Sequence, residues 1–132
     1  ESRYIEWNSV MYKIITMLIF IALSSNSTAW FYDSKAKVKS ITVYSYTDTV
    51  LVTLENDAGV EVSGTNVASC SNTSIFAIDG AMDDSRRNRM ISLLLTAKAS
   101  GKEVTVSYSN TGGCVSFGSN ADVYRGIQRL KN

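Results

Sequence analysis

The sequence predicts a mainly β domain with one α-helix, and three observations lead to this prediction. Several segments between residues 37 and 130 are rich in β-branched and aromatic residues that alternate with polar ones, as in strands with one buried face. One segment, 85–100, repeats its apolar residues at three- and four-residue steps, as in an amphipathic helix. No proline interrupts these segments. The predicted order is strand, strand, strand, helix, strand, strand.

The residues before this domain are typical of an export signal. The run 14–23 is apolar except for one threonine, follows Lys13, and precedes Ser27 and Ala29 at the small positions that a signal peptidase reads. The run is about half the roughly 20 residues that span a bilayer core; an uncleaved anchor or a buried core helix is the alternative. We predict an upstream segment outside the native precursor over 1–10, a secretory signal peptide over 11–29, and a single domain without a membrane span over 30–132.

Composition narrows the classes of function. In residues 30–132, 11 lysines and arginines nearly balance 10 aspartates and glutamates, so the strong basic field of a nucleic-acid-binding protein is lacking. The chain has no histidine, which excludes serine–histidine and cysteine–histidine catalysis and, with only two cysteines, disfavours a zinc site. We therefore expect a secreted or periplasmic protein that is not an enzyme and holds no cofactor or metal.

Cys70 and Cys114 are predicted to form a disulfide. Two cysteines in an exported chain most often pair, because the compartment is oxidising. Closing a loop of about 45 residues stabilises a fold by about 3–4 kcal/mol in the chain-entropy model. A reactive or metal-binding thiol is the alternative, but no histidine supports it.

The first two strands are predicted to form a hairpin. Residues 37–46 (KVKSITVYSY) alternate on two faces, with an irregularity that suggests a β-bulge near Lys39 and Ser40. Residues 47–48 (TD) supply the turn. Residues 49–55 (TVLVTLE) alternate again as the second strand. So short a connection between two strands is typical of a hairpin.

The third strand and the helix follow a polar, glycine-containing loop. Residues 74–79 (SIFAID) are apolar enough for a short strand. The helix is predicted over 85–100, with Asp83 or Ser85 as its N-cap. Gly101 is placed to end it in a left-handed conformation.

The last two strands complete the predicted order of secondary-structure elements. Residues 102–109 alternate strictly, and a loop around residues 112–114 leads to a final strand over 122–130. Five short strands with one helix between the third and fourth is the order of an OB-fold, a five-stranded barrel whose open end the helix plugs. A sheet with one helix packed on a face produces the same order and is the alternative.

Charged residues at the start of the helix have two interpretations. Asp79, Asp83 and Asp84 form a carboxylate cluster that could bind a cation or act as paired acid and base. The favoured interpretation is helix capping, because Asp83 and Asp84 lie where a helix N-terminus favours negative charge. Arg86, Arg87 and Arg89 follow at once, either as a solvated face paired with those aspartates or as an interface, where arginine is favoured. Arg86 and Arg89 are therefore our candidates for an oligomer interface.

Tyrosines are the best candidates for contacts with a ligand. A tyrosine offers an apolar face and a hydroxyl group, which suits sugar recognition and protein interfaces alike. Half-buried packing in the sheet is the alternative for each of the five concerned, which are Tyr32, Tyr44, Tyr46, Tyr108 and Tyr124.

Residues 91–108 (ISLLLTAKASGKEVTVSY) resemble the helix, glycine cap and following strand of the B subunits of subtilase-like and pertussis-like bacterial toxins. Cys70 lies at the matching distance before the helix, where that family carries a disulfide cysteine. Trp30 and Asp33 match the Trp-x-x-Asp at its start. The family's partner cysteine on the second strand and its further cysteine pair are absent here, so Cys70 is expected to pair with Cys114.

The resemblance implies a function. Those subunits are small exported OB-fold proteins that form rings of five, with the helix facing the pore, and bind sialylated glycans. Tyr108 falls on the family tyrosine that contacts the sugar, and Ser40, or Lys37 in another alignment, on the serine that binds sialic acid. We expect a non-catalytic homo-oligomer that binds a sialylated or other cell-surface glycan beside a catalytic partner subunit. The alternative is a small secreted or periplasmic structural or inhibitory protein with no glycan site.

Overall fold

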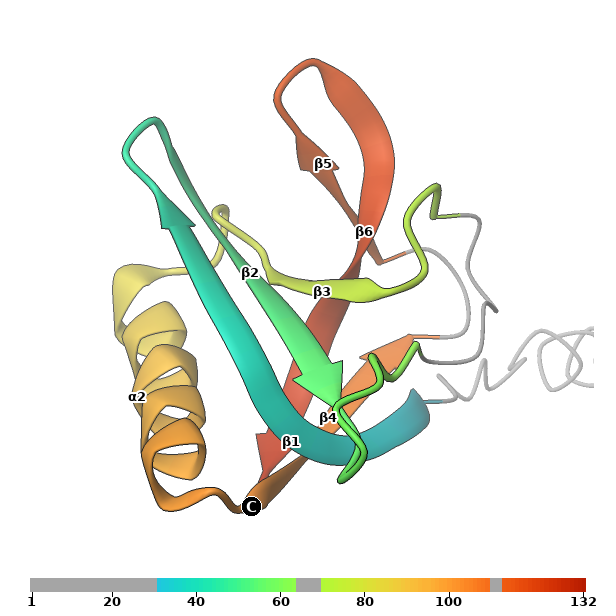
Figure 1. The fold of residues 1–132 in the computed structure, drawn as a ribbon. Helices are drawn as coiled ribbons and strands as arrows, with labels where there is room; N and C mark the ends of the chain where they lie inside the picture. The colour runs from blue at the N-terminus through green and yellow to red at the C-terminus, as the bar shows by residue number, and fades with distance from the viewer. Residues whose placement is uncertain (1–30, 64–69, 110–112) are drawn as a thin grey trace, which may run out of the picture.

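The computed structural model describes residues 31–63, 70–109 and 113–132, which form a mainly β structure with one helix (Figure 1). The elements in chain order are β1 (Phe31–Tyr44), β2 (Thr47–Glu55), β3 (Ile75–Ile78), α2 (Asp84–Ser100), β4 (Glu103–Ser109), β5 (Cys114–Phe117) and β6 (Asn120–Lys131). The signal peptide predicted over 11–29 and the upstream segment 1–10 lie outside the described residues.

The number of strands differs from the prediction. A mainly β chain with one helix is confirmed, but the described residues contain six strands, in the order β-β-β-α-β-β-β, where five were predicted. The additional strand is β5, in the segment expected to be a loop around Gly112-Gly113-Cys114. It has four residues (CVSF), which is too short for a periodic pattern to stand out beside glycines.

The strands pair in a circuit. Their order in the sheet is β3-β2-β1-β4-β6-β5, and β3 also pairs with β6. Phe76 and Ala77 of β3 lie parallel to Arg125 and Gly126 of β6, whereas the other strand pairs are antiparallel. Each of β1, β2, β3, β4 and β6 therefore has a hydrogen-bonded neighbour on both sides.

Strand β1 connects the two halves of this circuit. Its first half pairs with β4, from Phe31 opposite Ser109, and its second half pairs with β2. The register shifts between Val38 and Ser40, which confirms the predicted bulge. The strand starts six residues before the predicted start because β4 extends it. The turn to β2 lies at residues 45–46 rather than 47–48.

The main core lies between the strands and α2. Residues at or near zero exposure meet there from five strands and the helix: Ala36, Val38, Val50, Val52, Leu54, Phe76, Ile78, Leu94, Ala97, Val104, Val106, Tyr108 and Ile127. The Asp83 side chain accepts a hydrogen bond from the backbone N–H of Arg86, and Gly101 adopts a φ of 67°. The predicted N-cap and glycine C-cap are therefore both confirmed.

A second, smaller cluster lies on the outer side of β2 and β3. Leu51, Ala77 and Val115 are buried there, one from each of β2, β3 and β5. Strand β5 therefore covers the back of β3. This explains why β3 has consecutive buried residues rather than an alternating pattern, because a strand covered on both faces has no solvent side.

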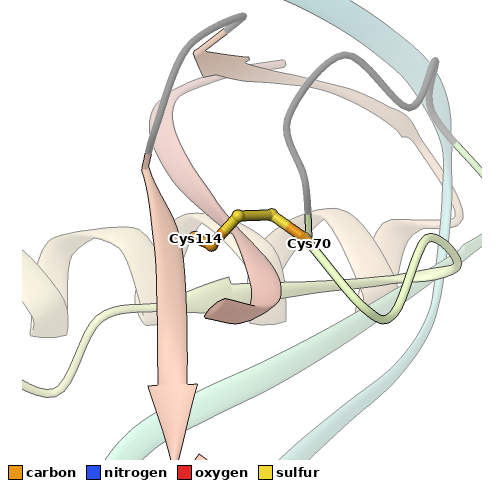
Figure 2. The surroundings of a disulfide bond; sticks show 2 residues. All are labelled: Cys70 and Cys114. Atoms are coloured by element: carbon orange, nitrogen blue, oxygen red, sulfur yellow. A yellow bond between two sulfur atoms is a disulfide. The ribbon is translucent and has the colours of Figure 1, made fainter. Parts of the chain in front are cut away.

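The predicted disulfide is confirmed between Cys70 and Cys114, whose Cα atoms are 5.6 Å apart (Figure 2). It joins the segment before β3 to the first residue of β5. Next to it, the backbone N–H groups of Ser71 and Asn72 donate to the carbonyl oxygens of Asp122 and Val123 in β6. A disulfide is compatible with an oxidising extracellular or periplasmic compartment. Among the residues with described positions, no helix has the length and apolar character needed to cross a membrane.

Candidate functional site

A pocket of about 430 Å³ opens where the β1–β2 and β5–β6 hairpins meet the turn after β3. We call it the hairpin pocket. Both hairpin tips lie at the same end of the molecule, at the top of Figure 1. The pocket is lined by Tyr46, Thr47, Asp48, Thr49, Asp79, Gly80, Ala81, Ser116 and Gly118. Three segments that are far apart in the sequence therefore contribute to one concave surface.

Local sequence shapes each wall of the hairpin pocket. The backbone N–H of Thr49 donates to the Thr47 hydroxyl, 3.2 Å away, which holds the start of β2. A Cβ atom on Gly80 would lie 2.9 Å from the Thr49 nitrogen, so only glycine lets the turn after β3 approach β2 this closely. Gly118 has a φ of 60°, as required at the first central position of a two-residue hairpin turn.

An aromatic cluster lies beside the pocket. The ring centroid of Tyr44 is 5.4 Å from that of Tyr46 and 5.3 Å from that of Phe117, and Phe117 is 5.6 Å from Tyr124. Tyr46 is nevertheless 71% exposed. Its ring contacts those of Tyr44 and Phe117, while much of its surface remains open to solvent and accessible for stacking.

Charge in the hairpin pocket is negative. Asp48 and Asp79 are the charged residues among the described residues that line it, and both are exposed. The Asp79 carboxylate accepts a hydrogen bond from the backbone N–H of Ala81 at 2.9 Å, and its second oxygen leaves acceptor capacity for a ligand. The lining thus combines carboxylates, hydroxyl groups and one aromatic face.

The nearby Arg87 is bound to the wall of the pocket and is not among its lining residues. Its guanidinium donates to the carbonyl oxygens of Gly80 and Met82, at 2.9 and 3.2 Å, and also to Asp84. Its side chain is only 12% exposed, and a guanidinium nitrogen lies 4.0 Å from Asp48. Arg87 therefore ties the start of α2 to the turn that forms one wall of the pocket.

Tyr108, the tyrosine predicted to contact a sugar, lies in the core. It is 1% exposed, with its ring 5.5 Å from Phe76 and 6.2 Å from Tyr32. The guanidinium carbon of Arg125 lies 4.9 Å from the ring centre of Phe76 and 5.2 Å from that of Tyr108. Burial lowers the pKa of Arg125, while its interaction and hydrogen bond with Tyr108 act in the opposite direction. Tyr108 thus presents almost no surface to a ligand.

The structure does not bring Ser40 and Tyr108 together. The Cα partner of Tyr108 on β1 is Tyr32, so the eight residues from Tyr32 to Ser40 correspond to about 26 Å of strand path. Ser40 is half-buried and lies opposite Thr53 of β2. Lys37, the other candidate from the resemblance, pairs with the Asp57 carboxylate at 2.9 Å.

Asp33 belongs to a separate cluster on the outer face of β1, β4 and β6. The Ser107 hydroxyl donates to its carboxylate, and the Arg129 side chain donates to the Ser107 oxygen at 3.1 Å. The hydrogen bond from Ser107, followed by the charges of Lys131 and Arg129, lowers the pKa of Asp33. These contacts connect three strands and do not reach the hairpin pocket.

Arg86 and Arg89, the predicted interface residues, are exposed on the first turns of α2. The Arg86 side chain pairs with the Asp83 carboxylate at 2.7 Å. The hydrogen bond from the Arg86 backbone N–H, and then the charges of both arginines, lower the pKa of Asp83. The local pairing that the sequence suggested is thus present for Arg86, and both side chains remain accessible.

Within residues 31–63, 70–109 and 113–132, no three histidine, cysteine, aspartate or glutamate side chains are grouped to hold a metal ion. Comparisons of the chain with protein-family models, with curated proteins and with solved structures find no match.

Sequence reasoning identified one part of the hairpin pocket and missed the rest. Tyr46 was among the tyrosines considered as ligand contacts. Asp48 is predicted only as a turn residue. Asp79 is predicted as the end of a strand and as part of a carboxylate cluster with Asp83 and Asp84, not as a residue of this pocket. The available signal was weak, namely an aromatic residue and a carboxylate at one hairpin tip, because the other walls come from segments 30 to 70 positions away.

Proposed function

We propose that this chain is an exported, non-catalytic carbohydrate-binding protein of the OB-fold type, and that the hairpin pocket is its glycan site. The observation that carries the proposal is the exposed ring of Tyr46 at the edge of a pocket lined by carboxylate and hydroxyl oxygens.

The strand pairings support an OB-fold barrel. The circuit joins β1, β2, β3, β6 and β4, with α2 placed between β3 and β4. This is the pattern of a five-stranded barrel in which β6 takes the place of the fifth strand. Strand β5 then belongs to the connection between the fourth and fifth barrel strands, as an addition that widens that connection.

The position of the pocket supports carbohydrate as the ligand. OB-fold proteins bind oligosaccharides and oligonucleotides on the face of strands 2 and 3, between the loop after strand 1 and the loop before strand 5. The hairpin pocket lies between the equivalent segments, because Tyr46 follows β1 and Ser116 and Gly118 precede β6. The negative lining disfavours a nucleic acid, whose phosphates need basic partners.

The chemistry of the lining also suits a sugar. One face of a pyranose ring is apolar enough to stack on tyrosine, while its edge carries hydroxyl groups that donate to carboxylates in strong, charge-assisted hydrogen bonds. Tyr46 and the two aspartates supply both kinds of contact. Export, which the leader predicts and the disulfide fits, would bring the pocket to extracellular glycans.

The wider proposal keeps what the toxin resemblance implies, namely a homo-oligomer assembled through α2 and a catalytic partner subunit. In that assembly Arg86 and Arg89 would contact the neighbouring copy. The glycan contacts expected at Tyr108 and Ser40 are replaced in this proposal by those of the hairpin pocket, because Tyr108 is buried.

Tyr46→Ala tests the proposal directly. We expect the purified, oxidised protein to bind glycans on an array, and Tyr46→Ala to weaken binding about tenfold, which corresponds to the roughly 1.4 kcal/mol of a lost stacking contact. Tyr46→Phe should retain most of the affinity because it keeps the ring. Affinities are measured by calorimetry or by titration in solution.

The matched control is Val43→Ala on the same hairpin. Val43 is 67% exposed and does not line the pocket, so binding should be unchanged. A wild-type protein that retains no glycan, with its fold intact by circular dichroism, would contradict the proposal and favour the structural or inhibitory alternative.

A further inference from the structure

We infer that the hairpin pocket selects sugars that carry no negative charge, and that it rejects acidic sugars such as sialic and uronic acids. The inference rests on the proposed function, because it concerns the ligand class of the same pocket. It departs from the sialylated glycan that the toxin resemblance implies.

The first step is the charge of the lining. Asp48 and Asp79 stand on two separate walls, one at the start of β2 and one after β3, and the described lining residues include no lysine or arginine. A carboxylate is an acceptor of hydrogen bonds and never a donor when ionised. Arg87 lies 4.0 Å from Asp48 and is shared with Asp84. A sugar acid in the pocket would therefore face the Asp79 carboxylate and an Asp48 carboxylate that is only partly neutralised.

The second step concerns the cation beside the pocket. Arg87 lies beside the pocket, with a guanidinium nitrogen 4.0 Å from the Asp48 carboxylate. Its guanidinium already donates to two carbonyl oxygens of the turn after β3, those of Gly80 and Met82, and to Asp84. Turning it toward a ligand would break these bonds in a side chain that is largely buried. Arg87 thus stabilises the wall of the pocket and is not available to bind an acidic ligand.

The third step is the gain for an uncharged sugar. Hydroxyl groups of a neutral hexose donate to carboxylates in short, charge-assisted hydrogen bonds. Replacing the hydroxymethyl group of the sugar by a carboxylate removes a hydrogen-bond donor and adds electrostatic repulsion. The same two aspartates therefore attract neutral sugars and repel acidic ones. A protonated amino sugar would gain attraction instead. The pocket therefore discriminates between sugars by their charge.

Matched pairs of monosaccharides test this inference. The methyl glycosides of glucose, galactose and mannose are titrated against their uronate forms, which differ only at C6, and amide shifts of residues 46–49 and 79–81 are followed by NMR at low salt. We expect at least one neutral glycoside to bind at the pocket about tenfold more tightly than its uronate. For that pair of sugars, Asp48→Asn combined with Asp79→Asn should bring the ratio of the two affinities, neutral glycoside to uronate, close to one.

Asp57→Asn combined with Glu103→Gln is the control, since it removes the same two charges from exposed positions outside the pocket. The affinity ratio should stay as in the wild-type protein. Uronates that bind at the pocket as tightly as the neutral sugars would overturn the inference and leave the proposed function standing. An unchanged ratio in the variant that combines Asp48→Asn with Asp79→Asn would also overturn it. A protein whose pocket resonances respond to no sugar of either kind would overturn the proposed function as well.

Discussion

At the scale of single residues, Arg125 is unusual because it is a charged residue buried in the core. It is 1% exposed and its guanidinium lies against the rings of Phe76 and Tyr108. An arginine is rarely buried unless it is paired, and here aromatic faces and the Tyr108 side chain supply the interactions. Tyr108 therefore packs in the core and contacts a buried cation.

Substitution of Arg125 separates its packing from its charge. Arg125→Ala leaves a cavity between two rings and should lower the free energy of unfolding by about 3 kcal/mol. Arg125→Met fills most of that volume without a buried charge, so its loss should be clearly smaller. Both are measured by urea unfolding. Equal losses in the two variants would contradict the packing explanation and point to the cation–aromatic contacts.

At the scale of elements, the two hairpins and the turn after β3 make the site, and β5 connects it to the disulfide. Cys114 is the first residue of β5, and Ser116 and Gly118 of the same hairpin line the pocket. Val115 packs on Leu51 and Ala77. Since β5 has a strand partner on one side only, β6, the disulfide is an important restraint on its position.

Removal of the disulfide should therefore affect stability and binding together. We expect Cys70→Ser combined with Cys114→Ser to lower the free energy of unfolding by about 3–4 kcal/mol. Glycan affinity should also fall, because β5 loses its covalent anchor. Chemical unfolding and glycan titration measure the two effects, with the reduced wild-type protein as a second preparation. If reduction lowers stability but leaves the glycan affinity unchanged, the disulfide's restraint on β5 is not needed for glycan binding.

At the scale of the whole molecule, the pairing of β3 with β6 decides the architecture. Only Phe76 and Ala77 of β3 pair with β6, yet this short parallel contact gives each of five strands two neighbours. The circuit leaves the outer face of α2 exposed, including Leu95, which is 53% exposed. An assembly through α2 would cover this face without disturbing the hairpin pocket at the end of the strands.

The assembly implied by the toxin resemblance can be tested by measuring the molar mass of the protein in solution. If α2 forms the interface, light scattering should give about five times the mass of one chain. Arg86→Glu combined with Arg89→Glu should then yield monomers that still bind glycan. The control makes the same charge change on β1 and β6, with Lys35→Glu and Lys131→Glu. A wild-type protein that is monomeric at every concentration would contradict the assembly and leave the pocket proposal intact.

The fold could be predicted from the sequence wherever short-range patterns are strong. The helix with its Asp83 cap and Gly101 end, the bulge near Ser40, and strands β2, β3 and β4 follow from periodicity and capping within a few residues. The first half of β1 and all of β5 were missed. The first half of β1 takes its strand conformation from pairing with β4, which is distant in the sequence. The four residues of β5 are too few for a periodic pattern, although its partner β6 follows directly after a short turn.

The sequence by itself determined the mainly β class, the single capped helix and the pairing of Cys70 with Cys114, because each depends on local periodicity or on there being two cysteines. Only the tertiary structure decided that Tyr108 is buried against Arg125 and that Tyr46, Asp48 and Asp79 share a pocket. The physical reason is that burial and concavity arise from strand pairings between residues tens of positions apart, which no local pattern encodes.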